Sequence, residues 1–339
     1  MHRFLLARFN VDDILQFGTV TLIERALSNF STSKGENERR MDEIYDRIIS
    51  SIRKKHPSIQ NYAYRALSWI GYAARTLTVQ ELLVAISVEA NQYHLDDSNV
   101  VGFKDLLDYC NGLLTSDGEL VRLVHLSLRN YLDRHHVIPE DAKEMYRAIA
   151  CSTYLSLDIL KECPCDTSFG NSFPFLDYAA NNLAFHLSKV KPEHYPETTR
   201  AVLKLLEGQG HRRVYCKINI KIGKPHDIPR LNLACAIGYE DAVKTLLKEG
   251  EVDINEKGPR DGLTSLSWAM VMRHEEVVKR LFGEDKLDWN CNGIMPLLLA
   301  MESRGKGMIP LFPEKGIEAN FTFGEVSQSG YGKTQLYRY

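Results

Sequence analysis

The sequence predicts a mainly α-helical protein whose last third is a solenoid of short helical repeats. Apolar residues recur at helical spacing along most of the 339-residue chain, and a single short stretch carries the signature of a β-hairpin. In the last third, a leucine-containing tetrapeptide returns at a nearly constant interval, which is typical of repeat arrays. Hydrophobic residues make up 44% of the chain and charged residues 25%, which is enough apolar material for packed cores.

Composition and charge exclude several classes of function. A net charge of −2 gives no electrostatic argument for a nucleic-acid or anionic-membrane partner. The seven cysteines are odd in number and irregularly spaced, unlike a secreted disulfide framework. No apolar run approaches the roughly 18 residues that a membrane helix needs, and the N-terminal run is too short for a signal peptide. We therefore expect an intracellular, cytoplasmic protein with neither a nucleic-acid nor a membrane partner.

Residues 1–57 are expected to be helical. A polar stretch over residues 31–40 predicts an exposed loop within this segment. His56-Pro57 is expected to end the helix that follows the loop, because the residue before a proline disfavours the helical conformation. That helix has one apolar face, formed by isoleucines at helical spacing: Ile44, Ile48, Ile49 and Ile52.

Residues 58–138 are expected to form one compact domain. The stretch from Tyr62 to Ala74 has the pattern of an amphipathic helix, and Thr78 with Glu81 forms the capping box that opens the next helix. A third helix follows, and Asp117-Gly118 between two apolar runs then predicts a two-residue hairpin turn. Three helices followed by a hairpin is the order of elements in a winged helix.

Residues 139–225 are expected to form a helical linker. The helix that leads into it has Ser127 as its candidate N-cap, since a serine hydroxyl can accept from the free amides of a first turn. The linker itself should contain further helices, over about residues 141–160, 176–190 and 196–207. Helices that alternate with short connections in this way indicate a solenoid-like stack.

Residues 226–339 are expected to form about three degenerate repeats, the last ones incomplete. The steps between the recurring tetrapeptides, 35 and 31 residues, bracket the roughly 33 residues typical of a repeat built from a helix pair and a finger-like turn. No such unit buries its apolar face alone, so the units must stack. Pro310 and Pro313 interrupt the third unit, and we expect weak order beyond about residue 302. The tetrapeptides are Leu231–Ala234, Leu266–Ala269 and Leu297–Ala300.

These residues resemble two known families. The repeats resemble ankyrin repeats, with Gly238 and the finger asparagines Asn255, Asn290 and Asn320 matching the pattern. The preceding region resembles the winged-helix region of fungal NACHT-type NLR-like proteins, also known as the GPI inositol-deacylase winged-helix domain. The winged-helix likeness is carried by Ala66–Ile70, Ala74–Thr78, Glu81-Leu82, Leu123–Ser127 and Tyr131-Leu132. On either side of it, Phe4–Arg8 and Asp42–Tyr45 resemble the helical tail of the NACHT module, and Pro174–Ala180 resembles the helical linker to the repeats.

The resemblance implies a multidomain receptor used in signalling, non-self recognition or programmed cell death. It also implies that residues 1–57 are the helical tail of a NACHT-like module whose nucleotide-binding core is missing from this chain. ATPase switching is therefore not carried over, and lipid hydrolysis is not assigned because no Gly-x-Ser-x-Gly elbow is present. We expect a non-catalytic protein–protein interaction or scaffold module that has no cofactor and no metal.

Two other functions remain open from the sequence. The chain could be the back half of a nucleotide-switched NTPase whose phosphate loop is missing, or a winged-helix regulator that binds DNA. The second is disfavoured because DNA binding needs a basic recognition helix and a basic wing. The third helix and the wing instead mix charges: Lys104, Asp105, Asp108, Asp117, Glu119 and Arg122.

Several short motifs resemble functional sites. Gly330–Thr334 looks like a phosphate loop, but Ser327 replaces the first glycine and no helix-length segment follows, so the start of another repeat is favoured. In the NLR-like family the region of His125 lies against the nucleotide module, so the resemblance makes His125 a candidate contact to that module. The favoured interpretation is instead that His125 packs at the end of the wing strand and caps the next helix. Cys163-Pro-Cys165 and His135-His136 lack further metal ligands and are interpreted as loop residues.

The finger turns of the repeats carry the candidate partner-binding residues. Fingers and the exposed flank of each first helix form the surface that binds partners in such arrays. We expect the partner to be another protein, with full-length relatives of this chain among the candidates. The residues singled out are Glu256, Lys257, Arg260 and Asp261 on the first finger and Trp289, Asn290 and Asn292 on the second.

Overall fold

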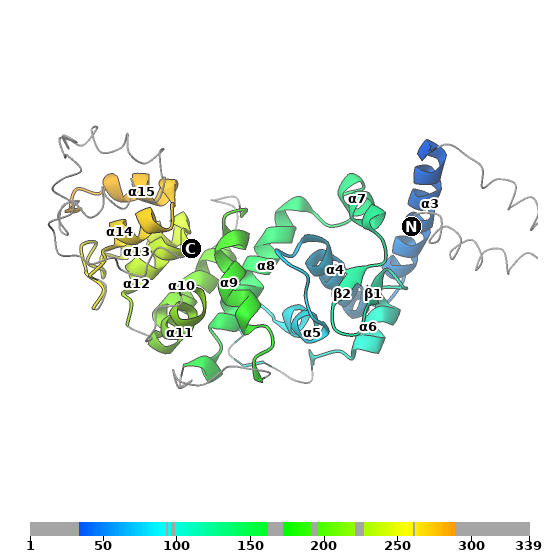
Figure 1. The fold of residues 1–339 in the computed structure, drawn as a ribbon, viewed down its shortest axis with the longest axis horizontal. Helices are drawn as coiled ribbons and strands as arrows, with labels where there is room; N and C mark the ends of the chain where they lie inside the picture. Colours follow the sequence, from blue (N-terminus) through cyan, green and yellow to red (C-terminus); the bar gives the residue numbers. More distant parts are fainter. Residues whose placement is uncertain are drawn as a thin grey trace, which may run out of the picture. The chain divides into compact units, whose positions relative to one another are not determined.

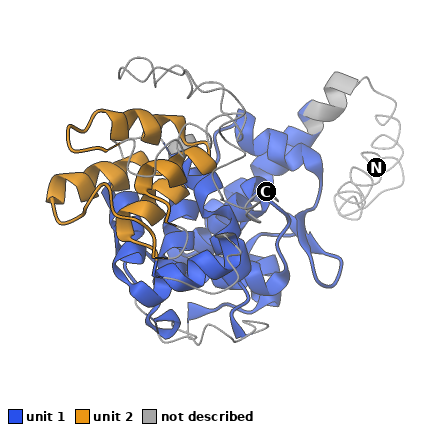
Figure 2. Ribbon diagram, turned by 60° about the vertical axis from the view of Figure 1, so that its left-hand side comes forward, with its two compact units in different colours: residues 1–227 blue, residues 228–339 orange. Residues whose placement is uncertain are grey.

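The computed structural model describes residues 34–288 except 93, 96–98, 162–171, 191–195, 221–226 and 260–261. The chain divides into two compact units, residues 1–227 and residues 228–339 (Figure 2). The described segments are mostly α-helical, with one small two-stranded sheet (Figure 1), which confirms the predicted mainly α class. No helix in the described part of the chain is both long and apolar enough to cross a membrane.

The first unit begins with α3 (Lys34–Arg53) and α4 (Pro57–Tyr72). The loop predicted over residues 31–40 is wrong where the structure describes it, because α3 already begins at Lys34. Glutamate and arginine are good helix formers, and here they extend the helix that the isoleucine stripe anchors. As predicted, the helix before His56-Pro57 ends there, since α3 stops at Arg53. Pro57 then begins α4, where its missing backbone amide is not needed for an intrahelical hydrogen bond.

A short helix pair and a hairpin follow, in α5 (Val79–Ser87), α6 (Phe103–Tyr109), β1 (Leu114–Ser116) and β2 (Val121–Leu123). The predicted capping box of Thr78 and Glu81 is present in both directions. The two strands are antiparallel around the Asp117-Gly118 turn, so the predicted hairpin is confirmed. The segment before α5 joins the sheet edge, because Val121 N–H donates to the Leu77 carbonyl at 3.0 Å.

The first unit continues through α7 (Leu126–Arg134), α8 (Glu140–Leu155), the 3-10 turn η2 (Asp158–Leu160) and α9 (Leu176–Leu187). It ends with α10 (Pro196–Glu207), α11 (Gln209–Tyr215) and the π-helical turn η4 (Cys216–Ile220). Helix α8 packs against both α9 and α10. Trp69 of α4 is buried in an aromatic cluster with Phe175 and Tyr178, which ties α4 to α9.

The sequence offered two residues that could cap α7, and the structure decides between them. Ser127 was the candidate N-cap, but the helix begins at Leu126 and the N-cap is His125. The imidazole Nδ1 of His125 accepts from the Ser127 backbone amide at 3.1 Å. The prediction that Ser127 caps the helix is therefore wrong, and the favoured interpretation of His125, a histidine that caps the next helix, is confirmed.

In the second unit, the described residues form two helix pairs: α12 (Arg230–Ile237) with α13 (Glu240–Glu249), and α14 (Ser265–Val271) with α15 (Glu275–Phe282). Leu231 and Leu266 are each the second residue of their helix, so the first two tetrapeptides occupy equivalent places, as predicted. The first helices α12 and α14 pack on each other, and the second helices α13 and α15 do the same. The third tetrapeptide, Leu297–Ala300, and the expectation of weak order beyond residue 302 lie outside the described residues.

Candidate functional site

The turn between the two helix pairs is the finger that the repeat pattern predicted. It runs from Gly250, which ends α13 with a left-handed backbone, to Thr264, which caps α14 by accepting from the Ser267 amide. Within it, Gly258 N–H donates to the Leu263 carbonyl at 2.9 Å, which closes the tip of the turn. The described part of the finger is thus held at both ends and by the contact between Gly258 and Leu263.

One buried asparagine anchors the finger to the helix pair before it. The side-chain amide of Asn232 donates to the carbonyls of Leu263 at 3.0 Å and Glu256 at 3.2 Å. Its carbonyl oxygen accepts from the Ser265 hydroxyl at 2.8 Å. Because the Asn232 side chain is buried in α12, these three bonds leave no polar group of its amide unsatisfied. They fix both sides of the finger to the first helices of two successive repeats.

A second asparagine links the base of this finger to the start of the next one. The Asn255 side chain donates to the Lys286 carbonyl at 2.8 Å and accepts from the Asp288 amide at 2.8 Å. Asn255 and Asp288 each belong to a finger motif that the sequence showed to recur, Asp253–Asn255 and Asp288–Asn290. The side chain therefore acts as a spacer between successive fingers, which explains why an asparagine returns at this position.

The finger exposes two of the predicted partner-binding residues. Glu256 and Lys257 are both exposed, while the Glu256 carbonyl is tied down by Asn232. Together the two side chains offer one negative and one positive group for recognition. The other predicted residues lie outside the described residues: Arg260, Asp261, Trp289, Asn290 and Asn292.

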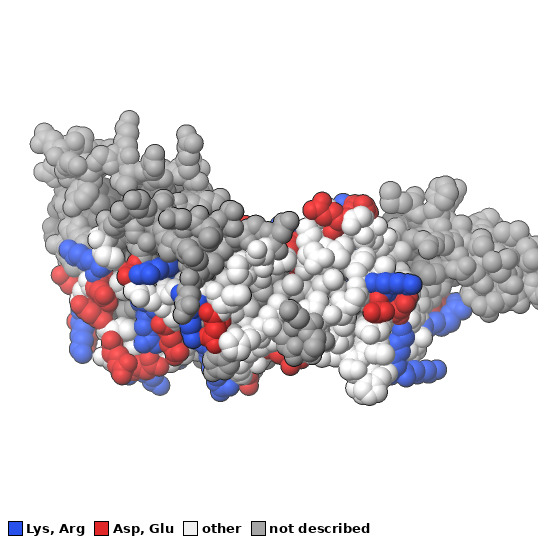
Figure 3. All heavy atoms as spheres, turned by 90° about the horizontal axis from the view of Figure 1, so that it is seen from below, with Lys and Arg blue, Asp and Glu red and all other residues white. Residues whose placement is uncertain are grey.

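The first helices do not contribute an exposed flank as the sequence analysis expected. Residues 231–237 of α12 and 265–270 of α14 are buried without exception. A helix that is apolar or buried all round serves as core, so the accessible surface of these two repeats lies on the fingers and on the second helices. Among the described side chains on the face in Figure 3, acidic and basic groups are interspersed, which favours partner recognition by pattern over attraction by net charge.

Four motifs from the sequence analysis either take structural roles or lie outside the described residues. His125 caps α7 and has its ring nitrogen engaged with Ser127. His135 ends the same helix, where its ring stacks on Tyr131. The Cys163–Cys165 pair and the glycine-rich stretch at 330–334 lie outside the described residues.

A chain of polar groups in the first unit has the order of a catalytic triad but not its accessibility. Glu144 accepts from His186 Nδ1 at 2.8 Å, and His186 Nε2 lies 2.9 Å from the Tyr178 hydroxyl, which accepts from the Ala74 amide. Both His186 and Tyr178 are fully buried. Burial raises the pKa of the Tyr178 hydroxyl far above its usual value. A nucleophile needs a reachable and readily ionised oxygen, so this arrangement packs α8 against α9 instead.

Comparison with known proteins identifies the second unit. Residues 217–322 match the family described as ankyrin repeats, in three copies. The chain therefore carries ankyrin repeats, which are protein–protein interaction modules, and α12 to α15 are the described part of the array. No curated protein matches the sequence.

Proposed function

We propose that this chain is a non-catalytic interaction and scaffold part of an NLR-like signalling receptor, and that it binds a partner protein through its ankyrin fingers. The observation that carries the proposal is the finger of residues 250–264. Its backbone is fixed by Asn232 and Asn255, while the Glu256 and Lys257 side chains extend into solvent. A pre-ordered recognition loop loses little entropy on binding, which is how repeat proteins reach useful affinity.

The receptor part of the proposal rests on the resemblance of the first unit to a winged-helix domain. Helices α4, α5 and α6 precede the β1–β2 hairpin, in the order that a winged helix requires. In addition, Val79 N–H donates to the Glu119 carbonyl at 2.8 Å and Thr78 bridges to Leu120, so the segment before α5 forms a third short edge of the sheet. This arrangement supports the winged-helix interpretation, and with it the NLR-like origin.

DNA binding gains no support from the geometry of this region. The exposed residues of α6 are one base and two acids: Lys104, Asp105 and Asp108. On the hairpin, the only described arginine, Arg122, pairs with Asp117 at 3.0 Å. These two elements therefore offer few cations in excess of their acids, and the neutralisation of phosphates by excess cations is a main source of affinity for nucleic acid.

The interaction proposal can be tested by cross-linking in the cell type that expresses the full chain. We expect a lysine-reactive reagent to join Lys257 to a co-purified partner. Reversing both finger charges, Glu256→Lys with Lys257→Glu, should release that partner at least about tenfold more readily than wild type, because like charges then face each other. The matched control is Lys244→Glu, which reverses an exposed charge on α13. Equal retention by the finger variant, or loss only with the control, would contradict the proposal.

The proposal that the chain is non-catalytic has a separate test. Calorimetric titration of the full chain with ATP and with ADP should give no saturable heat, because no described segment provides a phosphate-binding loop at a helix start. Binding of either nucleotide in the micromolar range would instead support the rival function, the back half of a nucleotide-switched NTPase.

A further inference from the structure

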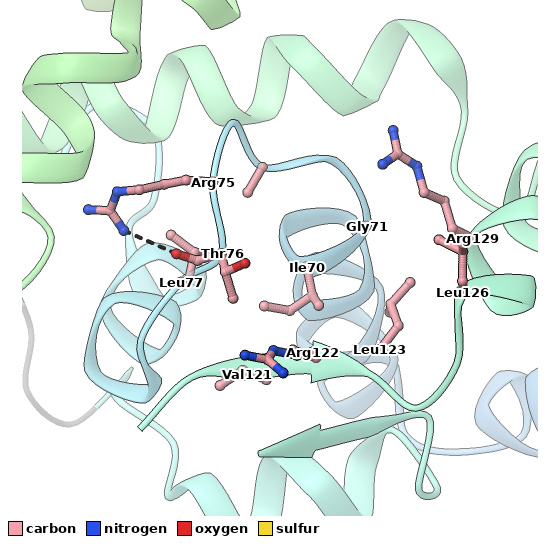
Figure 4. Close-up of a pocket in the computed structure, with 11 residues that line it drawn as sticks. Ile70, Gly71, Arg75, Thr76, Leu77, Val121, Arg122, Leu123, Leu126 and Arg129 are labelled. Carbon is pink, nitrogen blue, oxygen red and sulfur yellow. Dashed lines mark hydrogen bonds between the residues drawn. The ribbon is translucent and has the colours of Figure 1, made fainter. Parts of the chain in front are cut away.

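We infer that the first unit carries a second binding site, independent of the ankyrin fingers, that takes a short acidic segment with a leucine-like side chain from a partner protein. The site is a cavity of about 370 Å³ between the end of α4, the 73–77 segment, β2 and the start of α7. Figure 4 shows it in close-up. It is lined by Ile70, Gly71, Ala73, Arg75, Thr76, Leu77, Val121, Arg122, Leu123, Leu126 and Arg129.

The charge of the lining indicates the chemistry of the occupant. Three arginines come from three different elements, and none of the described residues that line the cavity is an aspartate or a glutamate. The remaining lining residues are apolar apart from Thr76 and the glycine. A cavity with an apolar floor and only positive charges on its walls is complementary to an apolar side chain flanked by carboxylates.

The three guanidinium groups differ in how free they are to bind. Arg75 is committed, since it holds Glu81 through both nitrogens at 2.6 and 2.9 Å and also reaches Asp177. Arg122 pairs with Asp117 at 3.0 Å, but the Arg122 side chain is 58% exposed and that of Asp117 50% exposed. Such an exposed ion pair contributes little stability, so an incoming carboxylate can replace Asp117 as the partner of Arg122. The Arg129 guanidinium stands over the Tyr72 ring and helps to lower the pKa of the Asp133 carboxyl, but it forms no ion pair within 4 Å with a described carboxylate, so it is the least committed of the three.

The positions of these groups favour a peptide over a single small anion. Figure 4 shows the guanidinium groups of Arg75, Arg122 and Arg129 set apart from one another, with those of Arg75 and Arg129 directed away from the apolar side chains, so the three do not converge on one point. A phosphate or a lone carboxylate would need converging donors. Groups set apart in this way instead match carboxylates that are set apart, as they are along an extended chain.

An unusually exposed leucine stands at the same rim. Leu126, the first residue of α7, has 72% of its surface exposed, and only Ile159 and Phe185 are comparable among the large hydrophobic residues that the structure describes. Together with Ile70 and Leu123 it forms the apolar side of the cavity. Covering a leucine removes apolar surface from water, so an incoming apolar side chain would gain from this contact.

The cavity is built from segments that are already fixed. The Val121 amide donates to Leu77 at 3.0 Å, which joins two walls, and the Ala74 amide donates to the Tyr178 hydroxyl at 2.9 Å. On the third wall, His125 caps α7 and so fixes Leu126. A partner therefore meets a preformed site and need not order it.

The test uses an array of short peptides in which one leucine and two glutamates are placed at every relative spacing, with a lysine-for-glutamate copy of each. Binding of the labelled peptides to the full chain is read by fluorescence polarisation. We expect saturable binding by a subset of the glutamate peptides and none by their lysine copies. Arg129→Gln and Leu126→Ala should each weaken that binding at least about fivefold, and raised salt should weaken it further.

Matched controls exclude general effects of charge or hydrophobicity. Arg200→Gln removes an exposed arginine from α10, and Ile159→Ala removes another exposed apolar side chain, 63% exposed, from η2. Both controls should bind the peptides as wild type does. The inference is overturned if no glutamate peptide binds, if the lysine copies bind equally well, or if Leu126→Ala and Arg129→Gln have no more effect than the controls. It is also overturned if Leu126→Ala abolishes a dimer of the chain in sedimentation, because the occupant is then a second copy.

Discussion

Glu144 and His186, 42 residues apart, meet through a 2.8 Å hydrogen bond between α8 and α9. The same carboxylate faces Arg147, whose Nη2 lies 3.1 Å from Glu144 Oε1. The Arg147 side chain is fully buried, and its other terminal nitrogen donates to the carbonyl and hydroxyl of Ser68 in α4. Glu144 is thus the counter-charge that allows a guanidinium to stay inside the first unit, and it connects three helices.

Removing this counter-charge should destabilise the first unit strongly. Glu144→Gln keeps the size of the side chain but leaves Arg147 buried without a carboxylate, which costs about 3 kcal/mol or more. Urea unfolding of the full chain measures the loss, and amide exchange over α8 and α9 assigns it to this unit. Glu197→Gln on the exposed face of α10 is the control and should change stability by less than about 0.5 kcal/mol. A Glu144→Gln protein as stable as the control would show that Arg147 is solvated by other means.

The same network predicts how stability depends on pH. Burial lowers the pKa of His186, and the opposing effect of Glu144 does not fully offset it, since Arg147 and Lys189 act in the same direction as burial. Burial raises the pKa of Glu144, but the hydrogen bond from His186 and the nearby Arg147 outweigh it and lower that pKa to about 2. His186 is therefore neutral in the folded protein, where it donates to Glu144 and accepts from Tyr178.

The pKa values of His186 and Glu144 are both lower in the folded protein than in the unfolded chain, so both groups stabilise the fold less as the pH falls. The His186 contribution is present above its unfolded pKa of about 6.5 and declines below it, until the lower folded pKa is reached. The Glu144 contribution, on the order of 3 kcal/mol, is lost between about pH 4.5 and pH 2. We expect the free energy of unfolding to fall from pH 7 to pH 5, and His186→Gln to reduce that slope. Part of the slope should survive, because burial also lowers the pKa of His211 and His274. An unchanged slope in His186→Gln would contradict the assignment.

Local patterns predicted much of the fold. The capping box at Thr78 and Glu81, the turn at Asp117-Gly118 and the equivalence of Leu231 and Leu266 all depend on residues a few positions apart, or on a repeat interval that the sequence displays directly. Such signals need no knowledge of tertiary contacts. The loop at 31–40 was misjudged because polarity was weighed above helix propensity.

The sites that depend on distant residues could not be predicted in the same way. Arg147 and Ser68 are 79 residues apart, and the cavity of Arg75, Arg122 and Arg129 is assembled from three elements. No sequence pattern relates such positions, since each arginine taken alone looks like an ordinary surface residue. The finger was found because its residues are contiguous, whereas its buried anchor, Asn232, became meaningful only once its three hydrogen bonds were seen.

That anchor gives a prediction for the second unit. Asn232→Ala removes two donors and one acceptor from a buried site and leaves the carbonyls of Leu263 and Glu256 without this partner, at a cost of about 2 to 3 kcal/mol. The loss should appear as faster amide exchange across the finger and α14. Asn130→Ala, on the exposed surface of α7, should leave exchange and stability unchanged. Wild-type protection of the finger in Asn232→Ala would mean that its backbone is held without the side chain.

Two glycines separate the effect of backbone conformation from that of packing in the repeat. Gly238 and Gly250 end α12 and α13, and both adopt left-handed backbone angles, with φ of +82° and +72°. A Cβ at Gly250 would meet nothing within 4 Å, whereas a Cβ at Gly238 would lie 2.3 Å from the ring of His274. That ring is held in place, because its Nε2 donates a hydrogen bond to the Ala236 carbonyl at 3.0 Å. Both alanine variants share the backbone penalty, and only one also has the clash.

We therefore expect Gly250→Ala to cost about 1 kcal/mol, the usual penalty for alanine in this conformation, and Gly238→Ala to cost at least about 2 kcal/mol more. Urea unfolding of the two variants gives the difference directly. Adding His274→Ala to Gly238→Ala removes the clash, so the double variant should be less destabilised than the sum of its two single changes. Equal costs for the two glycines would show that the His274 ring moves aside freely, and that the junction between the two described repeats is looser than these contacts indicate.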